Sequence, residues 1–82
     1  MEKRQKLERL TGHTAEQVVR KGTGGEHAAV VLQTREGERV ILQRIGGNPF
    51  DDPATRALVG CDVEVEGFRI GDVFRFRKAE AR

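Results

Sequence analysis

The stretch Leu58–Phe76, LVGCDVEVEGFRIGDVFRF, decides the fold class. Its first half, CDVEVEG, alternates two valines with acidic residues. The run DVFRFRK, residues 72–78, begins in its second half and alternates Phe74 and Phe76 with Arg75 and Arg77. Successive side chains of a β-strand point to opposite faces, so this period of two separates an apolar face from a charged one. The stretch therefore predicts two strands joined near FRIGD, with the acidic row of one strand beside the basic row of the next.

Two aliphatic runs upstream, Ala28–Thr34 and Arg39–Ile45, predict a second pair of strands. The intervening REGE suits a tight turn with positive φ at Gly37. EQVVRKG, which begins at Glu16, predicts a first strand. Thr14 with Gln17 three residues later also resembles a helix capping box, so strand and helix both remain open for Glu16–Lys21.

The segment Arg44–Gly60, RIGGNPFDDPATRALVG, holds both prolines of the chain. Asp52 is placed to cap a helix, Pro53 suits the first helical turn, and Gly60 suits the exit. These residues predict a two-turn helix between the third and fourth strands. Two hypotheses remain open for Phe50: burial under this helix, or exposure as an anchor for a partner.

The first fifteen residues form a charged head that we expect to be helical or disordered, and residues 16–82 form the folded domain. Four bases and two acids in Met1–Thr11 carry the whole net charge of +2, so the body of the chain is neutral. A neutral body weakens the case for a polyanion partner without excluding one.

Composition narrows the function further. With 82 residues the chain has room for one small domain, and its single cysteine excludes an internal disulfide. The sequence holds no serine, which excludes a serine nucleophile. His13, His27 and Cys61 are the only soft metal ligands, and their spacing fits no zinc site. Because no apolar segment approaches membrane length, we expect a cytoplasmic protein. We also expect no catalytic residues, no cofactor and no metal.

The pattern LVGCDVEVEGFRIGDVFRF, whose two strands follow three predicted strands and a helix, resembles the OB-fold, and the likeness covers roughly residues 16–78. The chain also resembles small bacterial OB-like proteins. The resemblance implies a mainly β, five-stranded Greek-key barrel with one short helix between strands three and four. We expect a core made of Val18, Val30, Leu32, Val40, Leu42, Leu58, Val63, Val65, Phe74 and Phe76.

OB-folds bind ligands on the face of strands two and three and on the adjoining loops. Carried onto this chain, the resemblance implies a nucleic-acid or partner face drawn from Arg20, Lys21, Gln33, Arg35, Arg39, Ile41, Gln43, Arg44, Phe68 and Arg69. The first hypothesis is a non-enzymatic binding module for a protein partner or for a second copy of the chain. The second is weak single-stranded nucleic-acid binding through the same face, in which only Phe68, expected in the last loop, offers a ring for base stacking.

Overall fold

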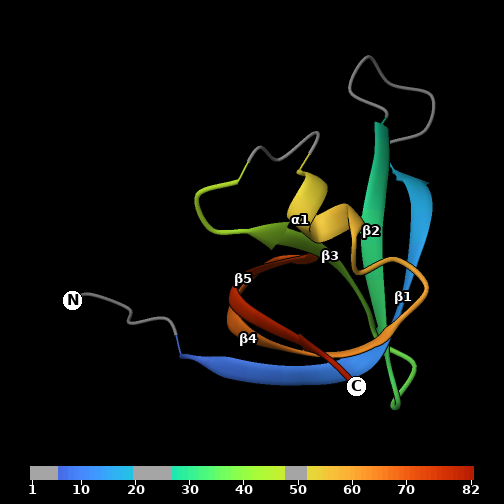
Figure 1. Ribbon diagram of the computed structural model, residues 1–82. Helices are drawn as coiled ribbons and strands as arrows, with labels where there is room; N and C mark the ends of the chain where they lie inside the picture. Colours follow the sequence, from blue (N-terminus) through green and yellow to red (C-terminus); the bar gives the residue numbers. More distant parts are fainter. Residues whose placement is uncertain (1–5, 20–26, 48–51) are drawn as a thin grey trace.

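A computed structural model describes residues 6–19, 27–47 and 52–82 of the chain. These residues are mainly β: five strands and one short helix follow one another in the predicted order (Figure 1). The elements are β1 (Glu8–Val19), β2 (His27–Thr34), β3 (Arg39–Arg44), α1 (Pro53–Arg56), β4 (Asp62–Ile70) and β5 (Val73–Ala81).

The strands form one mixed sheet that closes on itself in the order β1-β2-β3-β5-β4. Only β3 and β5 pair in parallel, and the other neighbours are antiparallel. The ring closes because β1 is long enough to serve two neighbours: its first half pairs with β4 and its second half with β2. Figure 1 shows the resulting bend of β1 around the ring.

Two glycines allow the close backbone contacts that this curvature requires. Gly12 lies where β1 passes from β4 to β2, and a Cβ there would run into the carbonyl oxygen of Gln33. Gly67 follows the register shift in β4, and a Cβ there would run into the carbonyl oxygen of Arg75. Glycine in a strand commonly marks such a bulge or close approach, so both positions are part of the fold's construction.

The interior is filled by the predicted alternating side chains. The two phenylalanines of β5 and the paired aliphatic residues of β2, β3 and β4 make the core, which comprises Val30, Leu32, Val40, Leu42, Val63, Val65, Phe74 and Phe76. Leu58 is half-buried and packs against them. Val18 was predicted in the core and lies outside it, with 58% of its surface exposed, because this end of β1 extends past the residues that pair with β4.

The predicted head is wrong from Glu8 onward, because Glu8–Ala15 belongs to β1 rather than to a helical or disordered segment. The domain boundary expected at residue 16 therefore falls inside a strand. Strand and helix were both open for Glu16–Lys21, and the structure shows a strand as far as Val19. Arg20 and Lys21 lie outside the described residues.

The helix is present but shorter than predicted. The Asp52 carboxylate accepts a hydrogen bond from the Thr55 backbone N–H and Pro53 occupies the first turn, as expected. The helix ends at Arg56, and hydrogen-bonded turns continue to Gly60. Gly60 has a positive φ of 82°, which suits the predicted exit from the helix. α1 lies over β3 and contacts it (Figure 1).

A buried hydroxyl joins this segment to β1. Thr14 is fully buried, and its hydroxyl accepts a hydrogen bond from the Cys61 N–H at 3.2 Å. The same hydroxyl donates toward the carbonyl oxygens of Leu58 and Cys61. The connection between α1 and β4 is therefore held directly against the strand that closes the ring.

Candidate functional site

The outer face of β2 and β3 is set by the residues that fill the interior. Because Leu32 and Val40 point inward, their neighbours Gln33 and Arg39 point outward, where they lie opposite each other in the register. Ile41 and Gln43 follow on the same face of β3. The predicted alternation of these two strands is therefore confirmed, and no outward position of either strand carries a carboxylate.

Five outward aliphatic side chains, one from each strand, form a row that crosses this face at Val31 and Ile41 and continues around the ring. Each is paired in register with the next, from β1 to β2, β3, β5 and β4. We call this set the apolar row; it comprises Ala15, Val31, Ile41, Val73 and Ile70. Its β2 member is nearly covered, whereas Ile70 at the far end is 48% exposed. A shallow hollow of about 180 Å³ beside its centre is lined by Gln17, Arg39 and Asp72 as well as by row members.

Polar residues flank the apolar row on both sides. Gln33 and Arg39 lie on one side, and on the other Gln43 lies opposite Arg75 of β5. Phe68 is the β4 neighbour of Arg75, so it lies within a strand and not in the predicted loop. It brings a half-buried ring to the edge of the face.

Three arginines near this face have no carboxylate partner. Arg35, Arg39 and Arg75 make no ion pair in the part of the chain that the structure describes. Arg35 continues the line of β2 into the turn, whereas Arg39 and Arg75 lie on opposite sides of the apolar row. Their guanidinium groups remain available to an anion from outside.

Arg44, another residue of the predicted site, is paired with a carboxylate of the fold itself. Its guanidinium donates to both oxygens of Asp52, at 2.8 and 2.9 Å. This hydrogen bond raises the pKa of Arg44, and together with the hydrogen bond from Thr55 it holds the pKa of Asp52 well below its usual range. The pair fixes the end of β3 to the helix cap.

Arg69 is also paired with carboxylates of the fold. It donates to Glu38 of the β2–β3 turn and to Glu8 of β1, the latter at 3.4 Å. The bond to Glu38 raises the pKa of Arg69 and lowers that of Glu38. Because Arg69 pairs in register with Phe74, whose side chain is in the core, it lies at the end of the ring and not on the face of β2 and β3. The remaining candidate, Phe50, lies outside the described residues.

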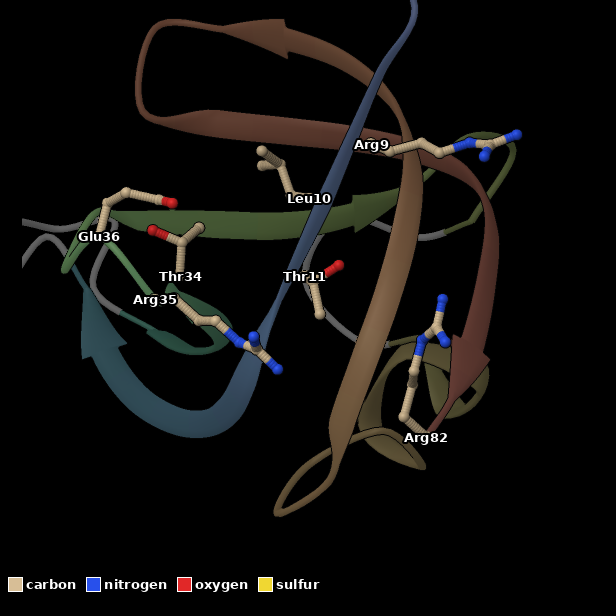
Figure 2. Close-up of a pocket in the computed structure, with 7 residues that line it drawn as sticks. All are labelled: Arg9, Leu10, Thr11, Thr34, Arg35, Glu36 and Arg82. Carbon is tan, nitrogen blue, oxygen red and sulfur yellow. The ribbon is translucent and has the colours of Figure 1, made fainter.

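A second hollow was not foreseen from the sequence. Arg9, Thr11, Arg35 and Arg82 line an open groove of about 450 Å³ beside β1, together with Leu10, Thr34 and Glu36 (Figure 2). Arg9 had been placed in the head, and Arg82 follows the last predicted strand by four residues. The register of β1 with β2 and β4 brings these segments together, and no local pattern in the sequence indicates it.

Reactive side chains do not gather around either hollow. Among the described residues no three His, Cys, Asp or Glu side chains are placed to hold a metal ion. His13 bonds Asp62 through Nδ1 at 2.9 Å, and both side chains are well exposed. Cys61 is half-buried beside the buried Thr14 hydroxyl. Over the same described ranges, the structure holds no helix of the length and apolarity that a membrane span requires.

Comparisons with known proteins add no constraint to this geometry. No family model matches the chain, no curated protein matches it, and no solved structure matches it.

Proposed function

We propose that the protein is an OB-like barrel that binds single-stranded nucleic acid, without catalysis, on the outer face of β2 and β3. The closed five-stranded sheet and the helix between β3 and β4 support the OB-like assignment, because both are expected of that architecture. Fold alone assigns no ligand, so the ligand is argued from the face.

The arrangement of arginines on this face carries the proposal. Arg39 and Arg75 lie on either side of the apolar row, and the outward positions of β2 and β3 hold no carboxylate. Guanidinium groups bind phosphates and supply the salt-dependent part of nucleic-acid affinity. The aliphatic row between them, with Phe68 at its edge, offers an apolar surface for bases. Because the described part of this face contains one aromatic ring, we expect the affinity to be modest.

The test is binding of a fluorescein-labelled oligothymidylate, measured by anisotropy over a series of salt concentrations. Each phosphate contact contributes about 0.7 to the slope of log affinity against log salt for single strands. The double variant Arg39→Ala with Arg75→Ala should therefore reduce the slope by about 1.4. The matched control is Arg77→Ala with Lys78→Ala, which removes the same charge from residues paired with Glu66 and Glu80. Absence of binding at low salt, or an equal loss in the control, would refute the proposal.

Self-association through the apolar row is the second candidate, and the exposure of Ile70 favours it. Burial of aliphatic surface between two copies would strengthen with added salt, whereas nucleic-acid binding weakens. Two copies meeting face to face would also bring the unpaired Arg39 and Arg75 of each into one interface, where like charges repel. This repulsion ranks self-association below nucleic acid. Light scattering over a range of concentrations, with Ile70→Gln as the variant that should abolish assembly, tests it separately.

A further inference from the structure

The groove beside β1 has the donors of an anion site, and the hollow that adjoins it reaches Gln33 at the edge of the β2–β3 face. Thr11 lies at its centre, and Figure 2 shows the Arg35 and Arg82 side chains approaching the space beneath Thr11 from opposite sides. The side chain of Arg9 points away from this space in the same view. An adjoining hollow of about 500 Å³ shares Thr11, Thr34, Arg35 and Arg82, so the two are parts of one groove, which we call the Thr11 groove.

Of the two arginines that face this groove, Arg82 is paired with a carboxylate and Arg35 is not paired within the described residues. One guanidinium nitrogen of Arg82 forms an ion pair with Glu64 at 2.7 Å. Glu64 pairs in register with Thr11, so its carboxylate holds Arg82 on the same side of the sheet as the Thr11 hydroxyl. The carboxylates that line the groove are Glu36, at one end, and Asp62, which is bound to His13 at 2.9 Å. A guanidinium carries five N–H donors, so both arginines keep donors for a ligand.

The backbone beneath the groove is rigid. Thr11 and Gly12 pair with β4, and Gly12 also pairs with Thr34 of β2. The Thr11 hydroxyl is therefore fixed at the junction of three strands, where it makes no hydrogen bond within the described residues. Paired strands therefore hold Thr11, whereas Arg35 lies in the β2–β3 turn and Arg82 follows β5, where its backbone N–H donates to the Asp62 carbonyl oxygen at 2.7 Å.

We propose that the Thr11 groove binds a phosphate group, with Arg35 and Arg82 donating from two sides and the Thr11 hydroxyl donating a further hydrogen bond. Planar guanidinium groups match phosphate oxygens in pairs, and a hydroxyl adds a donor that an aliphatic residue lacks. This site does not depend on the proposed nucleic-acid face, because Arg39 and Arg75 lie outside it.

The test uses inorganic phosphate titrated into the ¹⁵N-labelled protein, with chloride at equal ionic strength as the reference. Saturable shifts of the Thr11, Gly12 and Arg35 amides are expected with phosphate and not with chloride. Arg35→Ala with Arg82→Ala should weaken the phosphate affinity about tenfold or more, since each charge-assisted hydrogen bond is strong. The control Arg39→Ala with Arg75→Ala removes the same charge elsewhere and should leave the affinity within about twofold.

Thr11→Val tests the hydroxyl without changing charge or shape, and the amide spectrum reports whether each variant is folded. Unsaturated shifts, or equal weakening in the control, would overturn the proposal. The source of the phosphate is identified with oligothymidylates that carry either a 5′-phosphate or a 5′-hydroxyl. Tighter binding of the phosphorylated strand, lost with Arg35→Ala and Arg82→Ala, assigns the site to a strand end; equal binding of the two strands assigns it to a small phosphorylated ligand.

Discussion

Replacing Thr14 by valine removes a buried hydroxyl while keeping the shape of the side chain. The hydroxyl accepts from the Cys61 N–H and donates to one carbonyl at a time, either that of Leu58 or that of Cys61. Two hydrogen bonds are therefore lost, each with a net contribution of about 1 kcal/mol. The Leu58 carbonyl and the Cys61 N–H keep a bond to each other at 3.2 Å, which limits the cost of unsatisfied groups. The expected loss of unfolding free energy is about 2 kcal/mol.

Urea unfolding followed by circular dichroism measures this loss. With a slope of about 1 kcal/mol per molar urea, suited to a small domain, the midpoint of Thr14→Val should fall by about 2 M. The melting temperature should fall by roughly 8 to 16 °C. The control is Thr11→Val on the same strand, whose half-buried hydroxyl makes no hydrogen bond within the described residues, and which should change stability by less than about 0.5 kcal/mol. Equal stability of Thr14→Val and the native chain would show that these bonds do not hold α1 to β1.

Three further outcomes follow from the packing and the charges. Gly12→Ala should cost about 3 kcal/mol in urea unfolding, because its Cβ would meet the Gln33 carbonyl oxygen. Leu32→Ala should cost about 2 to 5 kcal/mol, whereas Val18→Ala should change stability by less than about 0.5 kcal/mol, since only the first is buried. Because its pKa is lowered, Asp52 stabilises the fold above the ordinary carboxylate pKa of about 3.9 and loses this effect as pH falls below it. Asp52→Asn should therefore lower stability at pH 7 and flatten the acid side of a plot of urea midpoint against pH.

The strands that were predicted correctly are those whose pattern is set by burial alone. Val63, Val65, Phe74 and Phe76 alternate with charges because one face of each strand contacts only the core. β1 lacks this signature, because two of its inward positions are Gly12 and Thr14. The first is required by a close backbone contact and the second by hydrogen bonds to residues more than forty positions away. Neither requirement is visible in a local window of sequence.

The same distinction separates the predicted site residues. Alternation was sufficient to place Gln33, Arg39 and Ile41 on one face, because it depends on β2 and β3 alone. It could not show that Arg69 is held by a carboxylate 31 residues away in the β2–β3 turn. It also could not join Arg75 to this face, since that depends on the parallel pairing of β5 with β3.

A net charge of +2 does not describe the surface that a ligand meets. Two of the three acidic residues of β4 are engaged by arginines: Glu66 by Arg77 and Arg9, which lower its pKa, and Glu64 by Arg82. These pairs neutralise the surface where β1, β4 and β5 meet and leave the face of β2 and β3 without a carboxylate at its outward strand positions. Attraction of a polyanion depends on the local field at contact distance, because charges beyond about 8 to 10 Å are screened at physiological salt. A nearly neutral chain can therefore present a face whose arginines Arg39 and Arg75 have no carboxylate partner among the described residues.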